Sequence, residues 1–279
     1  MTDIRVIDVE YLGTPQVIGA WVIDDTILVD PGPGTSVSRL LGQLGEWRPR
    51  AIALTHIHLD HAGATGALLE RWPETQVWVH ESGAPHLVDP ARLLRSARRV
   101  YGAALERLWG TMQPVPKEAI RAVRDGQRRG PLEVIHTPGH ASHHVCFLHR
   151  ATGAAFVGDV AGVRIPPSSA VLVPAVAPEF DPLGWTQSLE RVYAWRPTAL
   201  GLTHFGCHHD VDRHLAAVRR GLRDLVATRG SPDSVAQHVA AKLAGEGEDM
   251  VAAYEQAGQP HIFPAAVKRY LSMHAAGAR

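Results

Sequence analysis

The stretch LTHIHLDHAG, residues 54–63, places four ligand-type side chains within six positions: His56, His58, Asp60 and His61. It overlaps the end of AIALT, a short apolar run that is typical of a buried strand. Because side chains two apart in an extended segment point the same way, His56 and His58 can bind one metal ion. Asp60 and His61 then face a second ion nearby. Imidazole and carboxylate together suit Zn, Fe or Mn, so the stretch predicts a metal centre on a loop directly after a strand.

Three further ligand-type residues follow apolar runs elsewhere in the chain. His140 lies in HTPGHASHH, Asp159 in AFVGDVAG and His204 in LGLTHFG, each close to a glycine. Strand ends along one edge of a sheet can gather residues that are distant in sequence. Five histidines and two aspartates suit two ions of four or five ligands each, with one position left open.

The alternation of apolar and polar residues predicts short strands, and helical periodicity separates them. The three opening strands are expected to form an antiparallel meander, with a turn at Asp24 and Asp25. A helix is expected to begin at Asp181, with Pro182 in its first turn. The expected strands cover residues 4–12, 16–23, 26–30, 51–55, 76–80, 132–139, 143–148, 154–159 and 198–204. The expected helices cover residues 36–47, 64–72, 86–110 and 181–195, and the chain from residue 210 on. Sheets inside and helices outside predict an α/β layered sandwich.

The composition is that of an ordinary globular protein. Lys+Arg and Asp+Glu both total 28, so no excess charge indicates nucleic acid or a membrane as a partner. The start of the chain resembles no secretory signal, and no apolar run approaches the length of a membrane span. Two cysteines cannot form a disulfide framework, so a reduced, cytoplasmic setting is expected.

Taken together, THIHLDH, TPGH, GD and TH, in that order, resemble the motif of the metallo-β-lactamase superfamily of hydrolases. The resemblance covers about residues 1–207, and its nearest branch is that of glyoxalase II and the acyl-homoserine lactonases. It implies a four-layer αββα sandwich of two mixed β-sheets flanked by helices. We expect one domain over residues 1–279, with a helical insertion at about 85–125 and a C-terminal helical extension at about 208–279.

The resemblance also implies roles for the seven ligand-type residues. His56, His58 and His140 would hold the first metal ion, Asp60, His61 and His204 the second, and Asp159 would bridge them. Asp30 would support the site from behind the ligands. The expected cofactors are two divalent metal ions, Zn ahead of Fe or Mn.

The expected activity is hydrolysis of a small ester-like substrate (a lactone, thioester or ester) by a metal-bridging hydroxide, with Asp60 as the catalytic residue that orients it. Two alternatives remain: a mononuclear iron dioxygenase of the persulfide dioxygenase type, for which His56, His140 and Asp159 would suffice, and a phosphodiesterase. A non-catalytic metal site is disfavoured, because structural zinc sites are closed and four-coordinate. The resemblance excludes the flavodiiron branch, which has Glu where His58 stands.

Several features stay open at the level of the sequence. His144 and His208 follow closely on ligands and could line a pocket, whereas His143 is expected to be ordinary. The stripe of Arg92, Arg95 and Arg99 could hold an anion, although a solvated helix face is the expected role. The predicted partner is a small molecule, neither nucleic acid nor membrane, and a homodimer is allowed for. The pocket is expected to form from the insertion and the C-terminal helices.

Overall fold

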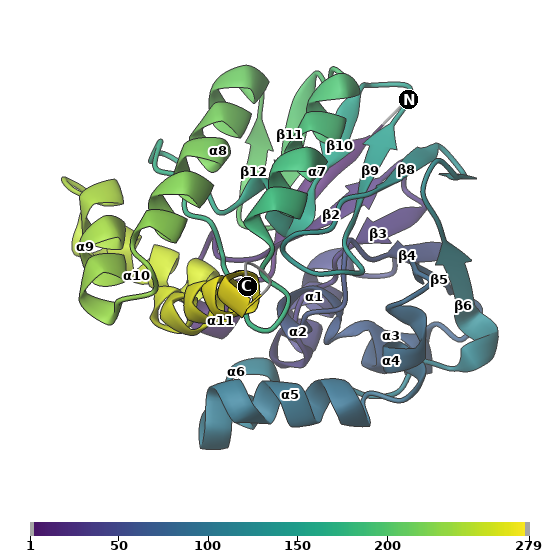
Figure 1. Ribbon diagram of the computed structural model, residues 1–279. Coiled ribbons are helices and arrows are strands. Elements are labelled where there is room, and N and C mark those ends of the chain that lie inside the picture. Colours follow the sequence, from purple (N-terminus) through teal and green to yellow (C-terminus); the bar gives the residue numbers. More distant parts are fainter. Residues whose placement is uncertain (1–2, 277–279) are drawn as a thin grey trace.

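The computed structural model describes residues 3–276, in which the strands form two six-stranded sheets (Figure 1). The first sheet has the order β1-β2-β3-β4-β5-β6 and the second the order β12-β11-β10-β9-β8-β7. The strands of the first are β1 Ile4–Asp8, β2 Gly19–Ile23, β3 Ile27–Val29, β4 Ala51–Ala53, β5 Gln76–His80 and β6 Ile120–Val123. Those of the second are β7 Arg128–Arg129, β8 Leu132–His136, β9 Val145–His149, β10 Ala154–Phe156, β11 Ala199–Leu202 and β12 Gly206–His208.

Both sheets are mixed, as predicted. Strands β1 to β3 form the expected antiparallel meander, and β3 to β6 then run parallel to their neighbours. In the second sheet, β10 and β11 are parallel and the other pairs are antiparallel. Asp24 and Asp25 both have φ 49°, the left-handed conformation that a tight turn between β2 and β3 requires.

The facing sides of the two sheets enclose an apolar core. Trp21 from the first sheet packs edge-on against Phe156 from the second, with their ring centroids 5.3 Å apart. Aliphatic side chains of β3, β4, β8 and β9 fill the space around this pair. Burial of such large apolar side chains is the main force that holds the two sheets together.

Helices cover the outer faces of the sheets and complete four layers (Figure 1). The helices of the described residues are α1 Val37–Leu44, α2 Leu59–Ala62, α3 Thr65–Arg71, α4 Ala84–Val88, α5 Ala91–Tyr101, α6 Leu105–Trp109, α7 Pro182–Ala194, α8 Val211–Ala227, α9 Pro232–Lys242, α10 Glu248–Gly258 and α11 Phe263–Ala276. Helix α7 begins as predicted, with Pro182 in its first turn and Asp181 Oδ1 accepting a hydrogen bond from the Leu183 amide at 3.1 Å.

The predicted α/β sandwich is confirmed, but two details of the prediction were wrong. The segment 85–125 is not helical throughout, because Ile120–Val123 forms the edge strand β6. Asp60 and His61 lie on helix α2 instead of on a loop. The C-terminal helices begin at Val211, close to the expected residue 210, after the short strand β12 that contains His208. Short strands such as β7 and β12 carry too few residues to show a period.

The C-terminal helices follow the predicted pattern. Leu215, Val218, Leu222 and Leu225 of α8 are all buried, as their helical spacing indicated. Within residues 3–276, no helix combines the length and the apolar character needed to cross a membrane. The expected domain over residues 1–279 remains a prediction, and its ends at residues 1–2 and 277–279 lie outside the described residues.

Candidate metal centre

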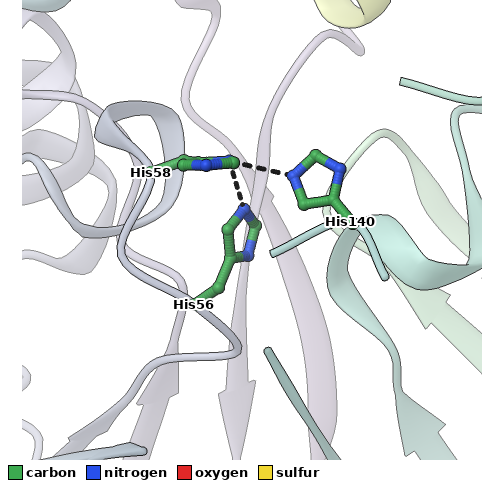
Figure 2. A group of neighbouring side chains, drawn as sticks. All are labelled: His56, His58 and His140. Atoms are coloured by element: carbon green, nitrogen blue, oxygen red, sulfur yellow. Dashed lines mark hydrogen bonds between the residues drawn. The ribbon is translucent and has the colours of Figure 1, made fainter. Parts of the chain in front are cut away.

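Three histidines from two segments converge on one point (Figure 2). His56 and His58 follow β4, and His140 lies in the loop between β8 and β9. His58 Nδ1 is 3.0 Å from His56 Nε2 and 2.9 Å from His140 Nε2. The three ligand atoms therefore lie close enough together to hold one ion, and we call these residues the first cluster.

A second group of ligand atoms lies beside the first, and we call it the second cluster. Asp60 and His61 come from α2, and His204 follows β11. Asp60 Oδ2 is 3.4 Å from His204 Nε2 and 3.8 Å from His61 Nε2. The short helix α2 makes this possible, because it turns the chain after His58 and carries two ligand-type side chains to the other side of the site.

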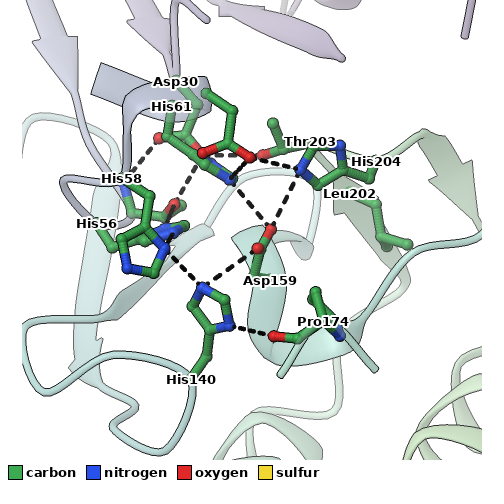
Figure 3. A network of polar contacts seen from close by, with 12 residues as sticks. Asp30, His56, His58, His61, His140, Asp159, Pro174, Leu202, Thr203 and His204 are labelled. Carbon is green, nitrogen blue, oxygen red and sulfur yellow. Dashed lines mark hydrogen bonds and ion pairs between the residues drawn. The ribbon is translucent and has the colours of Figure 1, made fainter. Parts of the chain in front are cut away.

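Asp159 stands between the two clusters (Figure 3). It follows β10, in the 3-10 helix Gly158–Ala161. Its Oδ2 is 3.3 Å from His140 Nε2, whereas its Oδ1 is 3.1 Å from His61 Nε2 and 3.6 Å from His204 Nε2. One carboxylate oxygen thus faces each cluster, which is the arrangement that a bridging ligand requires.

Hydrogen bonds on the far side of each ring orient the histidines. Three Nδ1–H groups donate to oxygen acceptors: His61 to Asp30 Oδ2 at 2.8 Å, His140 to the Pro174 carbonyl at 2.9 Å and His204 to the Val17 carbonyl at 2.7 Å. Since a carbonyl or a carboxylate can only accept, Nδ1 carries the proton of each ring in its neutral form, and Nε2 is then bare and turned toward the centre. A bare ring nitrogen backed by such a bond is the usual form of a histidine ligand.

Asp30 has the supporting place that the resemblance implied. Its Oδ1 accepts from the Thr55 amide at 2.8 Å, and its Oδ2 accepts from Thr55 Oγ1 at 2.7 Å and Thr203 Oγ1 at 2.9 Å. Thr55 Oγ1 in turn lies 3.1 Å from His56 Nδ1, so it accepts from that ring. Asp30 is fully buried and has φ 48°, a strained conformation for a residue other than glycine.

The chemistry of the donor set fits divalent cations. Within residues 3–276, His61 Nε2, His204 Nε2 and Asp159 Oδ1 are buried and have no hydrogen-bond partner. Leaving a buried polar atom unpaired costs about 1–3 kcal/mol, so three in one place call for a partner. A cation held by these atoms would satisfy all of them.

Burial and charge set the pKa values of the ligands in different directions. Burial lowers the pKa of His140 to about 3, and it also lowers the pKa of His56 and His58, so the first cluster stays neutral. Burial acts the same way on His61, but the carboxylates of Asp159 and Asp60 outweigh it and raise the pKa of His61 well above its usual value. The carboxylates therefore make the surroundings of the second cluster more negatively charged than those of the first.

A cavity of about 250 Å³ lies over both clusters and reaches His58 and Asp60. Its walls come from α5, from residues 174–179 and from residues 257–262, so the insertion and the C-terminal helices both line it as expected. The loop at 174–179 carried no signal in the sequence. Helix α5 has no fully buried residue and covers the cavity as an outer wall.

All seven predicted site residues meet at this centre. Of the arginines and histidines whose roles the sequence did not decide, only some line the cavity. Arg92 lines the cavity, whereas Arg95 and Arg99 do not. His143, which was expected to be ordinary, lines the cavity, whereas His144 and His208 do not. His144 lies behind the site, where its Nδ1 is 2.8 Å from Thr137 Oγ1.

A model of the metallo-beta-lactamase superfamily matches residues 14–198, which include six of the seven ligand-type residues. The chain belongs to this superfamily. The metallo-beta-lactamase fold-containing protein ST1585 of Sulfurisphaera tokodaii is 27% identical over 190 residues, which are 65% of this chain and 69% of that protein. The crystal structure of ST1585 from Sulfolobus tokodaii has a TM-score of 0.70 at 20% identity, and the match covers 96% of this chain and 99% of that one.

Two other superfamily proteins resemble parts of the chain. A hydroxyacylglutathione hydrolase of Enterobacter sp. (strain 638) is 30% identical over 147 residues, or 50% of this chain. The match spans less than half of the hydrolase, 45% of its length. TTHA1623, solved in a di-iron-bound form, has a TM-score of 0.51 at 25% identity, and the match covers 79% of this chain and 93% of that one.

Behind the metal centre, the buried His214 of α8 should make the protein less stable in acid. Its ring is 1% exposed and its Nε2–H donates to the Ala161 carbonyl at 2.7 Å. Burial lowers the pKa of His214 to about 4 from its usual 6.5, so the unfolded chain takes up the proton first as the pH falls. The neutral His214 ring contributes fully to stability above pH 6.5. About 2 kcal/mol of the free energy of unfolding should be lost between pH 8 and pH 5.

The measurement is urea unfolding at pH 8 and pH 5, for the wild type and for His214→Gln. Glutamine can donate a hydrogen bond but does not titrate. Between pH 8 and pH 5, the free energy of unfolding of the glutamine variant should therefore fall by about 2 kcal/mol less than that of the wild type. An equal loss in both proteins would contradict the assignment.

Proposed function

We propose that the protein is a hydrolase that uses two divalent metal ions to cleave a small ester-like substrate, a lactone, thioester or ester. The observation that carries the proposal is Asp159, whose two oxygens face two sets of ligand atoms, those of the first and the second cluster. A mononuclear enzyme does not need the second set. Zinc is the metal we expect first, and the di-iron form of TTHA1623 supports iron as the alternative.

Each cluster has its own part in the proposed reaction. The first cluster would hold one ion, the second cluster the other, and Asp159 would be shared between them. When bound, such ions activate water at neutral pH and polarise a carbonyl group. The matching hydrolase from Enterobacter supports a thioester as one substrate class.

Asp60 would move the proton. Although burial raises the pKa of Asp60, His61 and His204 outweigh it and lower that pKa below its usual value, so the carboxylate is ionised at neutral pH. Its side chain is 16% exposed and lines the cavity, where it can take a proton from the attacking water. As the bond between the acyl carbon and the leaving oxygen or sulfur breaks, the same carboxyl group can pass that proton to the leaving atom.

The lining of the cavity favours an ester-like substrate over a phosphodiester. Among the lining residues described, Arg92 is the one cation, and its side chain is exposed on α5 at the cavity wall. Phosphodiester hydrolysis would call for arginine or lysine side chains facing the metal ions.

The experiment that tests the proposal is elemental analysis of protein purified without added metal. It is followed by assays on γ- and δ-lactones, p-nitrophenyl esters and acyl-glutathione thioesters. We expect about two ions per chain and hydrolysis within this panel. One iron per chain, with activity that survives replacement of His61 and His204, would replace the proposal by a mononuclear iron dioxygenase.

Asp60→Asn tests the proton carrier within the same assays. Asparagine keeps the size of the side chain but cannot take up the proton. We expect kcat to fall by about 10²- to 10⁴-fold while the protein stays folded. Replacement of His140 by alanine should also abolish hydrolysis, through loss of the first ion. Wild-type activity in either variant with its metal complete would contradict these roles.

A further inference from the structure

His143 and His86 are the non-ligand histidines that line the cavity, and the ring of His143 lies beside the first cluster. His143 lies in the same loop as the ligand His140, three residues further on, and is 7% exposed. Its ring centroid is 6.0 Å from that of His58 and 6.2 Å from that of His56, both of the first cluster. Like His58, it lines the cavity. A substrate that binds at the first cluster would therefore come within reach of this ring.

In the part of the chain that the structure describes, neither nitrogen of His143 has a protein partner at hydrogen-bond distance. Within residues 3–276, Nδ1 is buried and unpaired. Nε2 is 4.0 Å from Glu179 Oε2, which is too far for a hydrogen bond. The carboxylate of Glu179 instead accepts from the Ser142 amide at 2.7 Å and from Ser142 Oγ at 3.2 Å. Among the described residues, the proton of the His143 ring thus has no acceptor.

The position of that proton follows from burial. Burial lowers the pKa of His143 well below its usual value, so the ring is neutral and carries one N–H group. Buried N–H groups without an acceptor are rarer in proteins than unpaired acceptors, which favours a bare Nδ1. The proton then lies on Nε2, the other ring nitrogen, and a ligand in the cavity can accept from it.

We propose that His143 binds the acyl oxygen of the substrate by donating a hydrogen bond from Nε2–H. The inference rests on the proposed hydrolase function and names a substrate contact within it. As water attacks the acyl carbon, negative charge develops on the acyl oxygen, and a donor already aimed at that oxygen stabilises it more strongly than in the ground state. No proton is transferred. His143 would thus act on the side of the first cluster, and Asp60 on the side of the second.

The test compares two substitutions at this position. His143→Phe keeps a flat ring but removes both nitrogens, whereas His143→Gln restores an N–H donor at a similar reach. Each protein is assayed with the substrate that the wild type hydrolyses fastest in the panel above, and its metal content is measured. His209→Phe is the matched control, because this histidine is exposed on the surface.

We expect the phenylalanine variant to keep its metal ions and to lose on the order of 10²-fold in kcat, with KM changed much less. The glutamine variant should recover at least about tenfold of that loss. An unchanged kcat in the phenylalanine variant, no recovery with glutamine, or loss of metal together with activity would overturn the role of His143 and leave the hydrolase intact. A metal-loaded wild type that hydrolyses nothing in the panel would instead overturn the proposed function.

Discussion

Replacing Asp159 with asparagine should remove at least one metal ion per chain and lower kcat/KM on the order of 10³-fold or more. Asp159 Oδ2 faces His140 and Oδ1 faces His61 and His204, so one side chain serves both clusters. Asparagine has one carbonyl oxygen, and its amide nitrogen is no metal ligand. The substitution also removes a buried negative charge that would offset the charge of two cations. A loss of about 4 kcal/mol in transition-state stabilisation corresponds to this fall in rate.

The measurements are elemental analysis and steady-state kinetics of the same preparation. Asp212→Asn serves as the control, because it makes the same chemical change at an exposed residue in the first turn of α8. Two ions per chain and undiminished activity in the Asp159 variant would show that this residue does not bridge the clusters.

Replacing Gly139 with alanine should destabilise the protein by about 3 kcal/mol or more, which corresponds to a fall of roughly 10 °C in Tm. Gly139 has φ 133°, which L side chains rarely adopt, and an added Cβ would lie 2.3 Å from Trp185 Cα and 2.4 Å from Trp185 N. The Gly139 carbonyl also accepts from the Asp181 amide at 2.8 Å, at the start of α7. Neither the loop nor the helix can therefore move away without losing contacts.

This substitution should reach the metal centre as well. His140 is the next residue, and its ring packs edge-on against Trp185 with centroids 5.3 Å apart. A displaced loop would carry His140 away from His56 and His58, so metal content should fall together with Tm. Thermal unfolding and elemental analysis measure the two effects.

Gly42→Ala is the control for the glycine substitution. Gly42 lies within α1, and an added Cβ would meet nothing within 4 Å. Alanine should raise stability there by up to about 1 kcal/mol, because it favours the helical backbone. Equal effects at Gly42 and Gly139 would mean that the contact with Trp185 is not what requires glycine.

Much of the fold was readable from local patterns because those patterns have a period. Alternation marked β1 to β3, and the spacing of Leu215, Val218, Leu222 and Leu225 marked the buried face of α8. The edge strand β6 was missed, since four residues within a segment rich in helical signals show no clear alternation. Its pairing with β5 decides its conformation, and pairing is a contact between distant residues.

The ligand set was also predictable, because each ligand-type residue follows within a few residues of the end of a strand. The sequence by itself therefore determined the superfamily, the two-sheet architecture and the seven residues that meet at the centre. Only the tertiary structure decided that one oxygen of Asp159 faces each cluster, and that His143 lines the cavity in place of His144 or His208. These two neighbours, His143 and His144, share the same sequence signals, and the fold of the loop between β8 and β9 turns one ring toward the cavity and the other behind the site. The direction of a side chain on a loop depends on packing against distant segments, and no local pattern encodes it.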